Sequence, residues 1–338
     1  MLLILMWQVS DNQIRGPSVR RSAALSATAL AGLSLLLSAC STTSGGPQAD
    51  PGTIDVVTST NVYGDIVKEI GGDKVNVKAL ITKASQDPHS YEATTQDKLA
   101  VSKARLVVEN GGGYDDFMHK LADDSNLGHE NIISAVEVSG LAPAEEPSAA
   151  STAADDEHGH SHDGTFNEHV WYSLGAMTKL ADAVEAKLAA LEPASASTFQ
   201  ANAASFKEEI AGLNAQAAGL AATSAEAPVA VTEPVPLYLL EAAGLVNKTP
   251  ADYTAAIEEG SDVPPAVLKQ ATELAGSKDI KFLAYNTQTE SPQTQALKKA
   301  AESAGVPVLD FSETLPEGKT YVQWMSGNVD NIKQALGK

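Results

Sequence analysis

The sequence predicts an α/β protein of two lobes, each with a central, mostly parallel sheet flanked by helices, joined by a long helix. Residues 54–81 show a strand, a helix and a second strand, the βαβ pattern of parallel sheets with a right-handed crossover. Residues 228–244 repeat its opening of strand, Thr-containing turn, helix and Gly. Between them, apolar residues recur at intervals of three, four and seven, which indicates a helix able to run along both lobes.

The N-terminal lobe is predicted to span residues 53–172. Strand and helix signals alternate, and glycines close the first helix and form a turn at residues 111–113. The predicted strands are 54–59, 75–81, 106–109 and 132–138, and the predicted helices are 62–70, 95–103 and 114–122.

The connecting region and the C-terminal lobe follow. Residues 173–223 are predicted to hold two helices, and the second of these is the linking helix that opens at Pro193 and runs for roughly 28 residues, or about 42 Å. The C-terminal lobe occupies residues 224–338. Its predicted strands are 228–232, 280–285 and 306–311, and its predicted helices are 237–243, 265–274, 293–304 and 320–336.

The N-terminal segment has the pattern of a secretory signal. Arg20-Arg21 precede an apolar run of about fifteen residues, which is short for a membrane span of ~20 residues. Leu37-Ser38-Ala39-Cys40 then resembles the bacterial lipobox, and Cys40 is the only cysteine. We therefore expect a signal peptide over residues 1–39, a lipidated Cys40 with a tether to residue 52, and anchoring to the outer face of the bacterial cytoplasmic membrane. A spare thiol, or translation starting downstream of Met1, is the alternative.

The chain is strongly acidic, with a net charge of −20. This charge argues against nucleic-acid partners and against binding anionic lipid headgroups by charge, and it suits a protein that attracts cations or is acidic for solubility alone. Residues 140–165 lack periodicity and are rich in Ala, Pro, Ser, Glu and Asp, so a disordered loop is expected there. This loop contains His158, His160 and His162.

Four segments at loops or strand ends carry side chains that bind metals. They are 87–92, 167–171, 231–234 and 310–318, two in each lobe. In the first, Pro88 fixes the turn, so that His89 has a defined direction. Imidazoles and carboxylates that converge on one cleft form a donor set for a first-row divalent cation. For each segment alone, a surface histidine or a solvated carboxylate is the alternative.

Together, these segments resemble the bacterial zinc/manganese solute-binding lipoproteins that feed ABC importers, the cluster A-I metal-binding group. The resemblance covers essentially the whole mature chain in family order. It is carried by the lipobox, the long central helix, and residues 87–92 (DPHSYE), 109–113 (ENGGG), 169–171 (HVW), 258–265 (EEGSDVPP) and 320–325 (TYVQWM).

The resemblance implies two α/β lobes joined by a rigid helix, with one divalent ion buried between them. His89 and His169 match the first two ligands of the family, and Glu233 matches the third, which is His or Glu in relatives. The fourth ligand is usually Asp. Glu313 fits this position best, with Asp310 as the alternative.

The same resemblance assigns the histidine-containing loop an auxiliary role, since such loops mark zinc proteins and are thought to collect or sense the ion. A solvated linker with three chance histidines is the alternative for His158, His160 and His162. Tyr285-Asn286 lies at another strand end, where it is expected to support the ligands.

The expected function is therefore the capture of Zn²⁺ outside the membrane for an importer. Two imidazoles with two carboxylates also suit Mn²⁺ or Fe²⁺, so these remain alternatives. The sequence has no Walker A motif and no multi-span segment, so the permease and ATPase should be separate chains. The protein itself is expected to be a monomer. No enzymatic activity is expected. A zinc hydrolase would keep an open coordination position, and a surface adhesin has no specific support.

Overall fold

The computed structural model describes residues 53–143, 166–224 and 226–338. The predicted signal peptide, Cys40, the tether and the three histidines His158, His160 and His162 lie outside these residues. Within the described ranges, none of the helices combines the length and the apolar character needed to cross a bilayer.

The N-terminal lobe is built on a four-stranded, fully parallel sheet of order β2-β1-β3-β4. Every residue of β3 is buried, as expected for a sheet covered on both faces. The elements are β1 (Ile54–Thr60), α1 (Asn61–Gly71), η1 (Gly72–Lys74), β2 (Val75–Ile81), α2 (Thr95–Val101), β3 (Leu106–Glu109), α3 (Asp116–Asp124), η2 (His129–Asn131), β4 (Ile132–Ser134) and α4 (Ala135–Ser139).

One predicted strand of this lobe is too long. The chain leaves the sheet at Ser134, whose hydroxyl accepts a hydrogen bond from the backbone N–H of Glu137. This bond caps α4, so the apolar residues after Ser134 pack as a helical turn rather than as a strand.

The C-terminal lobe repeats the arrangement, with a parallel sheet of order β6-β5-β7-β8. Its elements are β5 (Ala227–Val231), α7 (Leu237–Ala242), β6 (Leu245–Asn247), α8 (Ala251–Glu258), α9 (Pro265–Ala275), β7 (Leu283–Asn286), α10 (Pro292–Ala304), β8 (Val308–Phe311) and α11 (Tyr321–Ala335). The sequence did not predict β6 and α8. Both are short, and β6 has only three residues, too few to show a period.

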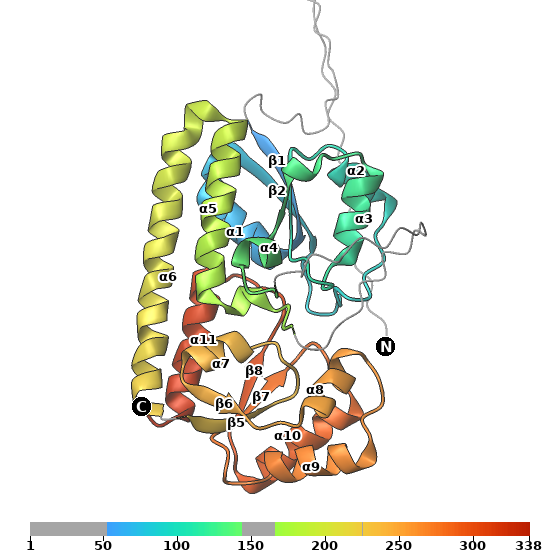
Figure 1. The fold of residues 1–338 in the computed structure, drawn as a ribbon, viewed down its shortest axis with the longest axis vertical. Coiled ribbons are helices and arrows are strands. Elements are labelled where there is room, and N and C mark those ends of the chain that lie inside the picture. The colour runs from blue at the N-terminus through green and yellow to red at the C-terminus, as the bar shows by residue number, and fades with distance from the viewer. Residues whose placement is uncertain (1–52, 144–165, 225) are drawn as a thin grey trace, which may run out of the picture. The chain divides into compact units, whose positions relative to one another are not determined.

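Two long helices connect the lobes: α5 (Leu174–Leu191), preceded by η3 (Val170–Tyr172), and α6 (Ala196–Ser224), preceded by η4 (Pro193–Ser195). The 29-residue α6 confirms the predicted linking helix. It packs on α1 and α5 of the first half and on α7 and α11 of the second (Figure 1). Its buried face carries Phe199, Ala203, Phe206, Ile210, Leu213, Ala217 and Leu220.

The two lobes share one apolar core. A single cluster of buried residues includes β1 and α1 of the first lobe and Tyr321, Trp324 and Met325 of α11. Hydrogen bonds also cross between the lobes. The Asn61 side chain bonds both backbone groups of Leu315 at 2.9 Å, and the Tyr321 hydroxyl donates to the Trp171 carbonyl at 2.6 Å. Two further buried clusters are each confined to one lobe, so the shared cluster and these hydrogen bonds fix the strand ends of both lobes relative to one another.

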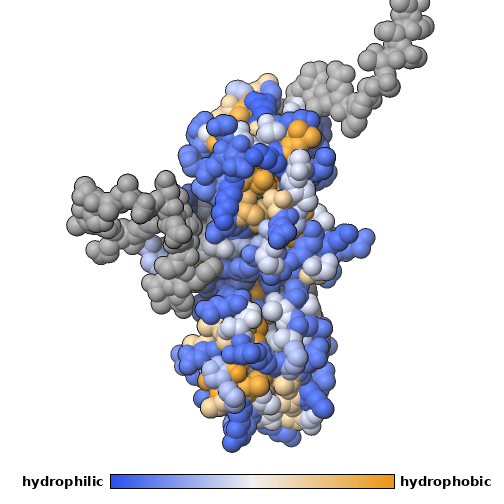
Figure 2. All heavy atoms as spheres, turned by 90° about the vertical axis from the view of Figure 1, so that its right-hand side faces the viewer, coloured by the Kyte–Doolittle hydropathy of each residue, from blue (hydrophilic) through white to orange (hydrophobic). Residues whose placement is uncertain are grey.

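Little large apolar surface is left outside this core. Among the described residues, the exposed large hydrophobic side chains are Leu99 and Leu141. Figure 2 shows a face that is mainly hydrophilic, with small, scattered apolar patches.

Candidate metal centre

A pocket of about 390 Å³ is lined by residues from both lobes. The four predicted ligands, His89, His169, Glu233 and Glu313, all contribute to its wall, while Asp310 does not. The remaining lining residues are Asp87, Ser90, Ile257, Glu258, Glu259, Gly260 and Thr289. Among the described residues that line the pocket there is no Lys or Arg to pair with the acidic side chains of its wall.

A larger pocket of about 600 Å³ adjoins it through His89. This second pocket is lined by the first lobe alone and includes Lys98 and Lys120. Of the predicted ligands only His89 reaches it, so the smaller pocket is the candidate metal centre.

His89 is held by the loop between β2 and α2. Its backbone N–H donates to Oδ1 of Asp87 at 3.0 Å, and the Ser90 hydroxyl donates to the other oxygen of Asp87 at 2.8 Å. These bonds form a local turn of the kind that Asp favours. The imidazole Nε2 lies 3.4 Å from Oε1 of Glu168, and the ring meets Tyr114 edge to face. The side chain is 26% exposed, which leaves it accessible from the pocket.

His169 is buried and held by Asn167, which lies two residues before it. Both the backbone N–H and the ring Nδ1–H of His169 donate to Oδ1 of Asn167, at 3.1 and 2.7 Å. The Asn167 amide in turn donates to the carbonyl of Pro234 at 3.0 Å, which fixes its orientation. Because Nδ1 carries the proton, the lone pair lies on Nε2. Burial and the nearby His89 lower the pKa of His169 to about 3, so the ring stays neutral, as a metal ligand must be.

Glu233 and Glu313 follow the ends of β5 and β8 and are joined by Asn286, the last residue of β7. The Asn286 amide donates to Oε2 of Glu233 and, at 2.8 Å, to Oε1 of Glu313. Burial, followed by the charge of Glu313, raises the pKa of Glu233 to about 8. Burial also raises the pKa of Glu313. Two carboxyl groups are thus held close together in a buried place where they are costly to ionise without a cation.

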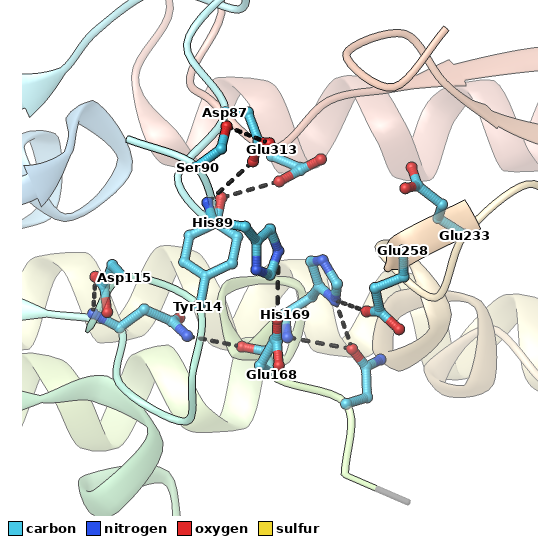
Figure 3. Close-up of polar contacts among 12 residues, drawn as sticks. Asp87, His89, Ser90, Tyr114, Asp115, Glu168, His169, Glu233, Glu258 and Glu313 are labelled. Carbon is cyan, nitrogen blue, oxygen red and sulfur yellow. Dashed lines mark hydrogen bonds and ion pairs between the residues drawn. The ribbon is translucent and has the colours of Figure 1, made fainter. Parts of the chain in front are cut away.

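Three of the predicted ligands form the tightest group. His89, His169 and Glu313 each offer a ligand atom, and these atoms lie within 4.8 Å of one another. Figure 3 shows the two imidazole rings next to each other, with Glu313 on one side and Glu233 and Glu258 on another. Asp310 lies in β8 opposite Tyr285, and its side chain is exposed.

The arrangement can be compared with known proteins. The family model described as "ZnuA: Zinc-uptake complex component A periplasmic" matches residues 56–335. The chain belongs to the ZnuA family. It is accordingly a metal-binding, substrate-binding protein of an ABC importer, a class without enzymatic activity, and it is extracytoplasmic.

Relatives of this ZnuA-family protein differ in the metal that their names state. The manganese ABC transporter substrate-binding lipoprotein scaA of Streptococcus gordonii is 22% identical over 318 residues, which are 89% of this chain and 95% of the relative. The zinc-binding lipoprotein AdcA of Streptococcus pneumoniae is 27% identical over 306 residues, 89% of this chain but only 58% of AdcA.

Solved structures share the fold. The structure described as "Crystal structure of ZnuA" has a TM-score of 0.63 at 21% identity and covers 84% of this chain and 98% of that one. FpvC of Pseudomonas aeruginosa, solved with Mn²⁺, has a TM-score of 0.64 at 22% identity, with the same coverage. These similarities confirm the predicted two-lobed α/β architecture.

The sequence analysis did not identify two acidic residues near the proposed ligands, Glu168 and Glu258. Burial, followed by Glu258 and Glu313, raises the pKa of Glu168 to about 8, and its Oε1 lies 3.4 Å from Nε2 of His89. Burial raises the pKa of Glu258 to about 7, and its Oε1 lies 3.9 Å from Nδ1 of His169. Glu168 adjoins a predicted ligand, which was a usable signal. Glu258 ends the unpredicted helix α8. It also begins the segment 258–265 that carries part of the family resemblance, but that resemblance gave it no role at the metal.

Proposed function

We propose that this ZnuA-family protein captures one Zn²⁺ through His89, His169, Glu233 and Glu313 and presents it to a membrane permease. The observation that supports this most is that two imidazoles and two buried carboxylates line one pocket, whose described wall residues include no Lys or Arg. Buried carboxylates require a counter-charge. A divalent cation supplies it and replaces the protons that their raised pKa values would otherwise retain.

Zinc is favoured over manganese by the imidazoles. Zn²⁺ binds imidazole nitrogen well, whereas Mn²⁺ prefers oxygen ligands. The neutral state of His169 and the lone pair of its Nε2 suit a zinc ligand. Manganese is the second candidate, because the carboxylates suit it and because scaA is named for it. We place Mn²⁺ second because two of the four proposed ligands are nitrogen donors.

Glu313 is our choice for the fourth ligand. It is 6% exposed and receives hydrogen bonds from Tyr114 and Asn286, whereas Asp310 is exposed and outside the pocket wall. A held, buried carboxylate loses less conformational freedom on binding an ion than a mobile surface one.

The segments outside the described residues complete the proposal. Cys40 carries a lipid that anchors the protein to the outer face of the cytoplasmic membrane, as the names of scaA and AdcA as lipoproteins support. His158, His160 and His162 serve as auxiliary metal-collecting residues, and because only the neutral imidazole binds metal, they bind it near and above the pKa of the ring and lose it below. The permease and the ATPase are separate chains, and this protein acts as a monomer.

The test is a metal competition on the full chain purified in detergent. Native mass spectrometry counts the bound ions, and a chromophoric chelator measures the affinity of the tightest-bound Zn²⁺ and Mn²⁺. The variants are His89→Ala, Glu313→Gln, and a deletion of residues 155–163. Asp310→Asn is the matched control for Glu313→Gln, since both remove one carboxylate from the same strand-end region.

We expect the tightest Zn²⁺ to survive the deletion and Asp310→Asn, and to be weakened at least 100-fold by His89→Ala and Glu313→Gln. If the protein binds Mn²⁺ more tightly than Zn²⁺, its substrate is manganese rather than zinc. If the tightest Zn²⁺ binding is lost on deletion of residues 155–163 and its affinity is unchanged in His89→Ala, the proposed site is wrong. For the anchor, Cys40→Ser should release the protein from membranes in cells.

A further inference from the structure

A second group of metal-binding side chains lies on the N-terminal lobe, apart from the pocket wall. His119 and Asp123 come from α3, and His129 comes from η2. Their ligand atoms lie within 4.8 Å of one another. Nε2 of His119 is 3.9 Å from one oxygen of Asp123, and Nε2 of His129 is 4.0 Å from the other. We call these three residues the α3 cluster.

The local fold explains why the three meet. His119 and Asp123 are four residues apart on one helix, so their side chains share a face. After α3 the chain turns back at once, because the backbone N–H groups of Ser125 and Leu127 bond carbonyls of the last helical turn. This return places the His129 ring 5.7 Å from the His119 ring, measured between centroids.

The carboxylate of Glu109 lies behind His119. Glu109 ends β3 and is only 5% exposed. Its Oε1 lies 3.3 Å from Nδ1 of His119, while its Oε2 has no hydrogen-bond partner among the described residues. A carboxylate that accepts the Nδ1 proton leaves the Nε2 lone pair free, and in His119 this atom faces Asp123.

Ordinary surface ion pairing does not account for this arrangement. Exposed ion pairs contribute too little to stability to offset the burial of a carboxyl group that lacks a full set of partners. A buried carboxylate behind a histidine, with a second histidine and an aspartate in front, is the pattern in which metal-ligating imidazoles are held.

We propose that the α3 cluster binds a second Zn²⁺, with Glu109 as the residue that positions His119. Two imidazole nitrogens and one carboxylate oxygen occupy three positions of a tetrahedral site. The side chains of His119, Asp123 and His129 are 48%, 54% and 77% exposed, so water completes the coordination. Zn²⁺ at this site therefore binds with lower affinity and exchanges faster than an ion enclosed in the pocket. This inference does not depend on the proposed ligands of the pocket.

The test requires a background without the loop histidines. In the full chain, His158, His160 and His162 are replaced by Ala, which leaves four of the seven histidines. Zn²⁺ is titrated while native mass spectrometry counts ions and NMR follows the histidine ring nitrogens. The variants in this background are His119→Gln, His129→Gln and Glu109→Gln. Asp124→Asn is the matched control, since Asp124 is an exposed neighbour of Asp123 that pairs with Lys98 instead.

We expect a second Zn²⁺ that shifts the ring signals of His119 and His129 together. Its affinity should fall at least tenfold in His119→Gln and His129→Gln and remain unchanged in Asp124→Asn and His89→Ala. Glu109→Gln should weaken it about tenfold without changing the melting temperature of the metal-free protein. The inference is overturned if this background binds only one Zn²⁺, if the second ion persists in His119→Gln, or if it is bound only as the chain dimerises.

Discussion

The hydroxyl of Tyr114 donates a hydrogen bond to Oε2 of Glu313 at 3.1 Å, from one lobe to the other. Tyr114 is fully buried, and its ring also contacts the His89 ring, with centroids 5.0 Å apart. It also meets the His169 ring edge to face, with centroids 5.9 Å apart. One side chain of the first lobe thus touches three proposed ligands, two from its own lobe and one from the other. The position of Glu313 in the pocket depends on the first lobe as well as on β8.

Tyr114→Phe should weaken binding of the tightest Zn²⁺ about tenfold while leaving the fold intact. Phe keeps the ring contacts but removes the donor that orients Glu313, and changes to groups that hold a metal ligand cost roughly 10–100-fold in affinity. Competition with a chromophoric chelator measures the change. Tyr91→Phe is the control, because Tyr91 bonds Asp97 rather than a proposed ligand. Unchanged affinity in Tyr114→Phe would show that Glu313 needs no such support.

Asn286→Asp should destabilise the metal-free protein by about 1–3 kcal/mol, and added Zn²⁺ should recover most of the loss. The substitution removes the amide that bonds Glu233 and Glu313 and places a third carboxyl beside them. Urea unfolding with and without Zn²⁺ measures both effects. Asn247→Asp is the control, because Asn247 also ends a strand but uses its Oδ1 as an acceptor for Thr249, a role that Asp keeps. Equal losses in the two variants would contradict the role given to Asn286.

The elements that the sequence predicted well are those set by local pattern. β1, α1 and β2 show clear periods, and α6 repeats its buried residues over 29 positions. The rule that parallel strands end at one edge of a sheet brought the segments 87–92, 231–234 and 310–318 together, because it needs only the order of the elements. The family resemblance then selected His89, Glu233 and Glu313 within them, and all three line one pocket.

The sequence did not show which candidate for the fourth ligand is buried, and it did not reveal the shortest helices and strands. The predicted strand 306–311 ends where β8 ends, at Phe311, but the sequence could not tell that Asp310 in the strand is exposed whereas Glu313 in the following loop is buried. β6 has three residues and α8 has eight, so neither gave a readable period, and with α8 the approach of Glu258 to His169 was missed.

The metal-free protein should lose stability as the pH rises from about 5 to about 8. The pKa of Glu168 and Glu233 is raised from 4.5 to about 8 in the folded chain. Between these values the folded state binds more protons than the unfolded state, so the unfolding free energy falls with increasing pH. Urea unfolding at several pH values in the presence of EDTA measures the slope.

Glu233→Gln should make this slope shallower, because it removes one of the groups that retain a proton on folding. Saturating Zn²⁺ should reverse the trend, since the ion binds the deprotonated carboxylates. If the unfolding free energy of the metal-free protein instead rises between pH 5 and pH 8, the carboxyl groups are ionised in the pocket and this prediction is wrong.

Phe206→Ala should destabilise both lobes together, by about 3–5 kcal/mol, because a large buried ring is lost from the shared core. Phe206 lies in α6, its ring centroid is 6.0 Å from that of Tyr321 in α11, and Tyr321 bonds Asp65 and Trp171 of the first lobe. Fluorescence of Trp171 and of Trp324, each followed with the other replaced by Phe, reports on the two halves during urea unfolding. Coincident transitions that shift equally in Phe206→Ala are expected, with Leu99→Ala, 46% exposed, as the near-neutral control. Separate transitions would mean that α6 joins two independently stable lobes.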